Sequence, residues 1–209
     1  MIAINNNKQQ FSNFNNTITK FQKSIIFAGS RTLTRARLLS WREYIEKLKF
    51  SDNYDWLTVL KAALEIYNGE LKGFAMLPDE KERREAYLKD YMKKLIMTSI
   101  QTVLYKFKKH VDDKEVTETP EEAKSYSIED IAIKVSIEFC LNINETSFLF
   151  TEIYEFFREN GLRENFINLL CPPIVAGQFR KEYIPESIME KLIVYLEAKG
   201  NYKLLEKII

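Results

Sequence analysis

The stretch between Pro78 and His110 is the feature that most constrains what this chain can fold into. Its apolar residues recur every three or four positions, the period of one face of a helix. They are Leu88, Tyr91, Met92, Leu95, Ile96, Ile100, Val103, Leu104 and Phe107. Acidic residues open the stretch and basic residues close it, as the helix dipole favours. The pattern predicts a helix over 79–109, about 45 Å long. Such a rod needs a stack of antiparallel helices to cover its apolar face.

Two shorter helices are expected before this rod. Ser40 followed by Glu43 has the spacing of a capping box, which predicts the start of the first helix. Asp52 or Asn53 can cap the second, whose sequence is WLTVLKAALEIYN. Gly69 follows it and can take the left-handed conformation that ends a helix.

The pair of helices around WLTVLKAALEIYNG holds no residue that does chemistry, so its side chains are interpreted as packing groups. Small residues let neighbouring helices approach, and aromatic rings fill the layer between successive pairs. The residues to which this structural role is assigned are Trp41, Trp56, Ala62, Ala63 and Gly69.

The rest of the chain repeats the order helix, tight turn, helix. An acidic segment with Pro120 and no apolar period, residues 111–126, predicts an exposed loop. Ser127 caps the helix that follows it, and Asn144 caps the next one, which Gly161 ends. The helices expected after the loop cover 128–143, 145–160, 162–171, 173–180, 186–199 and 202–209.

The amino-terminal part has a different character. Residues 1–20 include an Asn-rich, aperiodic run that predicts disorder. Residues 21–39 alternate in polarity around Gly29-Ser30, which predicts one β-hairpin of two strands. The expected domains are the lead-in 1–20, the hairpin 21–39, a first helical block 40–110 with the long helix, the acidic loop 111–126 and a second helical block 127–209. No fixed-period repeat is present, so the predicted fold is all-α, an irregular α-solenoid of stacked helical hairpins.

Composition argues against several classes of function. The 31 basic and 30 acidic residues leave a net charge of +1, which gives no general attraction to nucleic acid or to an anionic membrane. Cys140 and Cys171 form no CxxC pair, so neither a disulfide framework nor a zinc site is expected. His110 is a single histidine at a helix end, and the six glycines are scattered. We therefore predict no enzyme, no catalytic, cofactor or metal residues, no cofactor, and a cytoplasmic location.

Two stretches of the sequence resemble the vacuolar protein sorting subunit 8 family of the CORVET endosomal tethering complex. The first is LLSWREYIEKL with WLTVLKAALEIYNGELKGFAML. The second is IEFCLNINETSFLFTEIYEFFRENGLRENFINLLCPPIV with IPESIMEKLIVYLEAKGNYKLLEKII. The resemblance covers residues 21–209 and implies the central α-solenoid of the family. It implies that the hairpin is similar to the last strands of a β-propeller. The family's propeller, which contacts a Rab GTPase, and its RING-type zinc module have no counterpart here, so we interpret the chain as a middle piece.

The resemblance implies a non-catalytic scaffold that acts by protein–protein interaction in endosomal membrane fusion and in vacuolar or lysosomal protein transport. Its expected partners are other tethering-complex subunits, with a Rab GTPase met only indirectly and membrane association only through the complex. Contact surfaces are expected on exposed ridges of 79–109 and of the final pair 186–209.

Two alternatives stay open from the sequence. One is a helical-repeat segment of another trafficking complex, similar to a HOPS subunit or to the clathrin heavy chain. The other is a nucleic-acid binder, which would use the basic residues near the amino terminus. These are Lys20, Lys23, Arg31, Arg35 and Arg37. We interpret them as polar positions of the hairpin, and we expect no nucleic acid among the partners.

Overall fold

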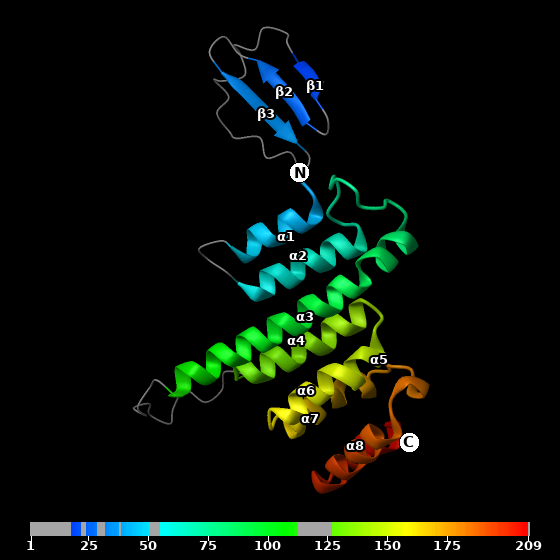
Figure 1. Ribbon diagram of the computed structural model, residues 1–209. Helices are drawn as coiled ribbons and strands as arrows, with labels where there is room; N and C mark the ends of the chain where they lie inside the picture. The colour runs from blue at the N-terminus through cyan, green and yellow to red at the C-terminus, as the bar shows by residue number, and fades with distance from the viewer. Residues whose placement is uncertain are drawn as a thin grey trace. The chain divides into compact units, whose positions relative to one another are not determined.

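The computed structural model describes residues 18–21, 24–28, 32–37, 39–50, 55–112 and 127–208. Helices account for most of them, and a small antiparallel sheet lies at the amino-terminal end, so the mostly helical fold is confirmed (Figure 1). The chain divides into two compact units, Met1–Tyr87 and Leu88–Ile209. The boundary falls inside the long helix α3, Lys81–Asp112. The predicted lead-in and acidic loop lie outside the described residues, except for 18–20 and 111–112.

The sheet has three strands where two were predicted. The strands are β1 Ile18–Phe21, β2 Ser24–Ala28 and β3 Leu33–Arg37, in the order β1-β2-β3 with antiparallel pairing throughout. In the register of β1, Ile18 pairs with Phe27 and Phe21 pairs with Ser24. A strand of four residues shows too little alternation to stand out in the sequence.

The first unit continues with α1, Trp41–Lys49, and α2, Trp56–Asn68, which pack against each other. The capping box is present as predicted, because Ser40 Oγ accepts from the Glu43 amide at 3.2 Å and Glu43 Oε2 accepts from the Ser40 amide at 3.0 Å. The predicted cap of α2 was wrong. Asp55 is the N-cap, and its carboxylate accepts from the amides of Leu57 and Thr58.

The residues to which packing was assigned all lie in the first unit. Trp41, Ala62 and Ala63 are buried, and Trp56 is half-buried. The Trp41 ring meets the edge of the Tyr87 ring at a centroid distance of 6.2 Å.

The end of α2 is closed by an arginine from the start of α3. Gly69 has a φ of 78°, the left-handed conformation expected of it. Arg84 is only 7% exposed and donates hydrogen bonds to the carbonyls of Tyr67 at 3.0 Å, Asn68 at 3.1 Å and Asp79 at 2.7 Å. A helix end leaves such carbonyls without partners, so the guanidinium takes the role of a cap. A Cβ at Gly69 would lie 2.6 Å from Arg84 Cζ, so any other residue there would both strain the backbone and displace the guanidinium.

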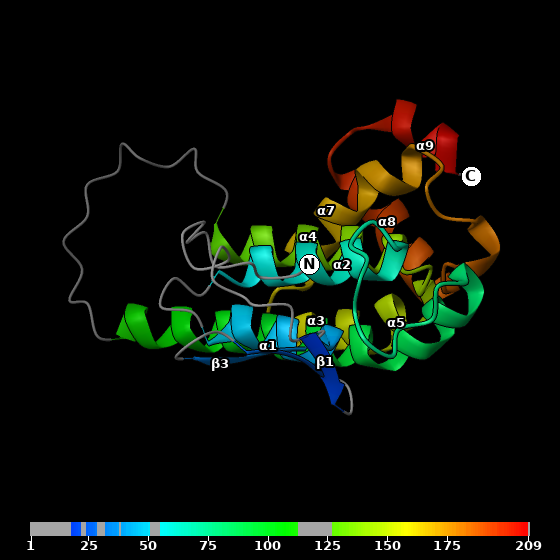
Figure 2. The same ribbon diagram turned by 90° about the horizontal axis from the view of Figure 1, so that it is seen from above.

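The second unit contains the rest of α3 and the helices that follow it. They are α4 Ile128–Asn142, α5 Thr146–Phe148, the π-helix η2 Leu149–Ile153, α6 Tyr154–Glu159, α7 Arg163–Val175, the 3-10 turn η3 Lys181–Tyr183, α8 Glu186–Ala198 and α9 Tyr202–Ile208. α7 packs against α4, α6, α8 and α9, and α8 packs against α9. Figure 2 shows α7, α8 and α9 together in this unit. Phe139, Phe157 and Phe166 are almost fully buried among these helices.

The structure corrects two helix predictions in this unit. The helices expected over 162–171 and 173–180 are one helix, α7, which runs through Pro172 and Pro173. Prolines remove amide donors inside a helix, yet Leu170 and Ile174 are buried on either side, and this packing holds the last turn in place. None of the described helices combines the length with the apolar character that crossing a membrane requires.

Candidate functional site

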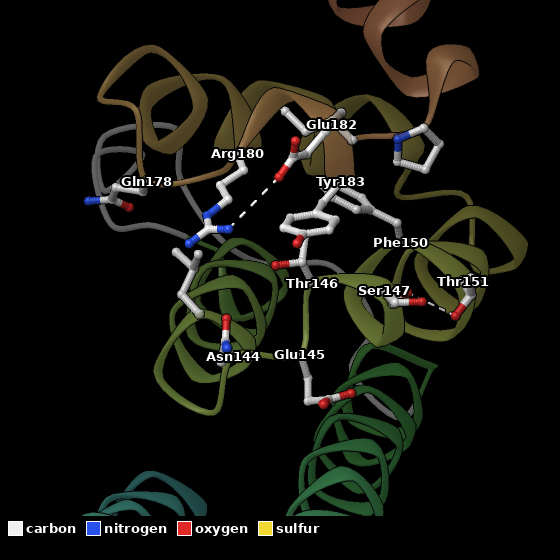
Figure 3. A pocket seen from close by; sticks show the side chains of 13 residues that line it. Asn144, Glu145, Thr146, Ser147, Phe150, Thr151, Gln178, Arg180, Glu182 and Tyr183 are labelled. Carbon is white, nitrogen blue, oxygen red and sulfur yellow. Dashed lines mark hydrogen bonds and ion pairs between the residues drawn. The ribbon is translucent and has the colours of Figure 1, made fainter.

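A pocket of about 690 Å³ opens in the second unit, a size typical of ligand sites. One wall is formed by residues 141–151, where α4 gives way to α5 and η2. The other is formed by residues 178–185, which connect α7 to α8 (Figure 3). We call it the Arg180 pocket, after the one arginine in its lining. The two walls are about thirty positions apart in the sequence, so the fold of the second unit creates the pocket.

Asn144 shapes the first wall, in a role that differs from the predicted one. It does not cap the next helix, because Glu145 occupies the N-cap position there. Instead Asn144 has a φ of 55° and ends α4. Its amide donates to the Leu141 carbonyl at 3.1 Å, and the Glu145 amide donates to the Cys140 carbonyl at 2.9 Å. This pair of bonds is the Schellman motif, in which asparagine is the usual substitute for glycine.

A π-helical turn gives the same wall a second irregularity. The run from Thr146 to Glu159 is helical throughout, but over η2 the amide of Tyr154 bonds to the carbonyl of Leu149, five residues back. Thr151 Oγ1 donates to the Ser147 carbonyl at 2.9 Å beside this turn. Such π-bulges are frequent at functional sites. Here the turn places Phe150 in the pocket lining.

Glu145 fixes this wall from behind. It is 7% exposed and forms ion pairs with Lys89 and with Lys93, the second at 2.6 Å, both on α3. Figure 3 shows its carboxylate pointing toward α3 and away from the other wall. Burial alone would raise the pKa of Glu145, but the hydrogen bonds from Lys89 and Lys93 outweigh burial and hold that pKa below its usual value. The carboxylate is therefore ionised at neutral pH.

The other wall carries the exposed charges. Arg180 Nη1 lies 3.9 Å from Glu182 Oε1, and the two side chains are 77% and 66% exposed. The Arg180 guanidinium also lies 5.9 Å from the centre of the Tyr183 ring. An ion pair this long and this exposed contributes little to stability. Within the part of the chain that the structure describes, the Asn144 and Gln178 side-chain amides form no hydrogen bonds.

The groups around the pocket are suited to binding. Its hydroxyls come from Thr146, Ser147, Thr151 and Tyr183, and the lining holds no histidine that could activate them. Cys140 lies just behind the wall, where burial above all raises the pKa of its thiol to about 12. Among the described residues, no three His, Cys, Asp or Glu side chains gather as metal ligands do. The pocket therefore presents the Arg180 guanidinium, the amides of Asn144 and Gln178 and several hydroxyls around an apolar base that includes Phe150.

The sequence did not single out this pocket. None of the five packing residues lines it, and the expected ridges on the long helix and the final pair lie elsewhere. Of the basic residues considered for nucleic acid, Arg35 donates to Ser24 Oγ at 2.8 Å and Arg37 pairs with Glu43 at 2.5 Å. The side chains of the other three fall outside the description. The one local signal for the pocket is the asparagine that follows the end of α4.

The Glu145 ion pairs lead to a prediction about stability and pH. Replacing Glu145 with glutamine should lower the free energy of unfolding by about 2 kcal/mol at neutral pH, because both lysines lose a charged partner. Folding lowers the pKa of this carboxyl, so its contribution is complete above the ordinary value of 4.5 and is lost as the pH falls through the folded value. Urea unfolding of both proteins at several pH values measures the difference.

A matched control for this prediction is Glu152→Gln, on the exposed side of η2. It removes the same charge from the same segment and should leave stability nearly unchanged. A difference between Glu145→Gln and the wild type that persisted undiminished well below pH 4.5 would contradict the electrostatic explanation.

Comparison with known proteins identifies a similar protein at low sequence identity. No protein-family model matches it, and no solved structure matches it. It is 24% identical over 197 residues to the vacuolar protein sorting-associated protein 8 homolog of Homo sapiens. The match covers 92% of this chain and 12% of the human protein, so the chain spans a small part of its relative's length. The chain is thus a distant homologue of vacuolar protein sorting-associated protein 8, as the two sequence stretches predicted.

Proposed function

We propose that this chain is a non-catalytic scaffold segment of an endosomal tethering complex and acts by binding other subunits of that complex. The observation that carries the proposal is the distant homology, which extends over 92% of the chain to a protein named for vacuolar protein sorting. The mostly helical fold agrees with it. The role belongs to endosomal membrane fusion and to protein transport toward the vacuole or lysosome. Contact with a Rab GTPase would be indirect.

The architecture proposed for this role is an irregular α-solenoid. Packing between neighbours supports it, because α1 meets α2 in the first unit and α7, α8 and α9 meet one another in the second. Each helix of such a stack buries one face and leaves another for partners. From the distant homology we further propose that the sheet of β1, β2 and β3 is the edge of a β-propeller. We also propose that membrane association on endosomes is peripheral and through the complex.

Partner contact is proposed on the exposed apolar side chains of the second unit. Tyr105 on α3, Val194 on α8 and Tyr202 on α9 all present most of their surface to solvent. Tyrosine is one of the residue types that provide most of the binding energy in protein interfaces, and Val194 adds exposed apolar surface. They lie on the two ridges from which the sequence predicted subunit contacts.

Co-precipitation of tether subunits tests the proposal. In the longer protein of which we interpret this chain as a middle piece, an internal deletion of residues 40–209 should lose the other subunits. The triple variant Tyr105→Ser, Val194→Ser, Tyr202→Ser should recover at least about tenfold less of them, because tyrosines in an interface often dominate its affinity. The matched control replaces Phe50, Leu57 and Met76 with serine, which removes three exposed apolar side chains from the first unit. Full recovery of subunits by the deletion variant would refute the scaffold role.

A further inference from the structure

The walls of the Arg180 pocket are fixed by contacts between lining residues and side chains outside the pocket. Glu145 ties the first wall to α3 through Lys89 and Lys93. Phe179, itself buried, packs against Phe150 with ring centroids 5.7 Å apart and thereby joins the two walls. These contacts hold the backbone of both walls, while the side chains of Asn144, Gln178 and Arg180 stay exposed to solvent and accessible to a ligand.

The polar groups at one end of the pocket form a set of hydrogen-bond donors. Arg180 reaches from the connection between α7 and α8 toward Asn144, and Gln178 lies at the same end (Figure 3). A guanidinium offers a planar pair of N–H groups that matches both oxygens of a carboxylate. Glu182 competes for it only through a long, exposed contact, so a ligand carboxylate can displace it at small cost.

The remaining lining suits a peptide main chain. An amide side chain carries both a donor and an acceptor, which is what the alternating N–H and C=O groups of an extended segment require. Asn144 and Gln178 supply such amides on opposite walls. Phe150 and Ile184 form an almost buried apolar base of the pocket, and the half-exposed Tyr183 ring offers apolar surface beside it. Side chains of an extended peptide can rest there.

The charge of the lining argues against phosphorylated ligands. A phosphate group carries close to two negative charges at neutral pH. Among the lining residues whose side chains the structure describes, it would meet Arg180 as the cation and Glu182 and Glu145 as anions. Lys89 and Lys93 lie on α3 behind Glu145 and form ion pairs with it, so they are not lining cations. A single carboxylate is the anion that this balance accepts.

We propose that the Arg180 pocket binds an extended segment of a partner protein and holds an aspartate or glutamate of that segment on Arg180. The proposal rests on the scaffold function proposed above and specifies the chemistry by which one partner is recognised. Arg180 provides the anchor for the carboxylate. Asn144 and Gln178 align the main chain of the segment beside it.

Selection from a displayed library of random heptapeptides tests the proposal with the purified chain as bait. Enriched sequences should share an acidic residue at one position. Their fluorescein-labelled forms, measured by fluorescence anisotropy, should bind at least about tenfold more weakly to Arg180→Ala, because a bidentate charged contact is lost. Changing the shared acid to its amide should have the same effect.

Two further variants sharpen the measurement. Asn144→Gly removes the side-chain amide, and glycine tolerates the positive φ of this position. This variant should bind the peptide severalfold more weakly. Arg158→Ala removes an exposed arginine of α6 that pairs with Glu155 outside the pocket, and should change nothing. Circular dichroism of each variant checks that the helices are intact.

Three results would overturn the proposal: no enriched peptide, enriched peptides that bind the wild type and Arg180→Ala equally, or a shared basic residue whose binding depends on Glu182. The scaffold function is judged separately by the deletion of residues 40–209. If that deletion releases the tether subunits while Arg180→Ala leaves peptide binding unchanged, the scaffold role stands and the pocket proposal fails. If Arg180→Ala abolishes peptide binding while the deletion keeps the subunits, the pocket proposal stands and the scaffold role fails.

Discussion

Replacing Arg84 with methionine should lower the free energy of unfolding by about 3 kcal/mol, because three buried or partly buried carbonyls that accepted from a charged donor lose that partner. The carbonyls are those of Tyr67, Asn68 and Asp79. Methionine keeps most of the length and the apolar character of the arginine stem, so the loss reports on the guanidinium. Urea unfolding followed by circular dichroism measures it.

The neighbouring residue provides the control for this prediction. Arg83 is 78% exposed and pairs with Glu80 one turn earlier on the surface. Arg83→Met removes the same charge from the same turn of α3 and should cost less than about 0.5 kcal/mol. If Arg84→Met and Arg83→Met lowered the free energy of unfolding equally, the loss would come from net charge and the capping of α2 by Arg84 would not contribute to stability.

A second large effect is expected at Phe157. Its ring is fully buried in α6 and lies 5.8 Å from the ring of Phe166 on α7, measured between centroids. Phe157→Ala should lower the free energy of unfolding by about 4 kcal/mol, since it removes buried apolar surface and leaves a cavity that helices cannot easily fill. Calorimetry of the variant would show this as a lower melting temperature.

Phe156 is the matched control, one position earlier and only half-buried. Phe156→Ala removes the same atoms from a place where solvent can fill the space, so its cost should be clearly smaller. If Phe157→Ala and Phe156→Ala had the same melting temperature, the buried face of α6 would have been assigned wrongly.

Features that depend on nearby residues could be predicted from the sequence. The long helix was expected over 79–109 and is observed over Lys81–Asp112, because its apolar stripe and its charge order are local signals. The capping box at Ser40 and the helix end at Gly69 are equally local, since their partners lie within one turn.

What the sequence could not show depends on residues that meet only in the fold. Arg84 caps carbonyls sixteen and seventeen positions earlier, and no spacing pattern in the sequence predicts a contact over that separation. The Arg180 pocket joins two segments that are separated by α6 and α7. We predicted that a helix ends before Pro172, as proline generally disfavours the helix interior. The helix continues instead, because Leu170 and Ile174 are buried on either side of the prolines.

The tryptophans and the cysteines of the chain lie in different units. Its two tryptophans, Trp41 and Trp56, both lie in the first unit, whereas its two cysteines, Cys140 and Cys171, both lie buried in the second. Burial raises the pKa of each thiol, so a thiol reagent must wait for the helices around it to open. Indole fluorescence therefore reports on one unit and the rate of thiol modification on the other. The natural chain carries its own pair of independent spectroscopic and chemical reporters, and no label has to be introduced to learn whether the two units open together.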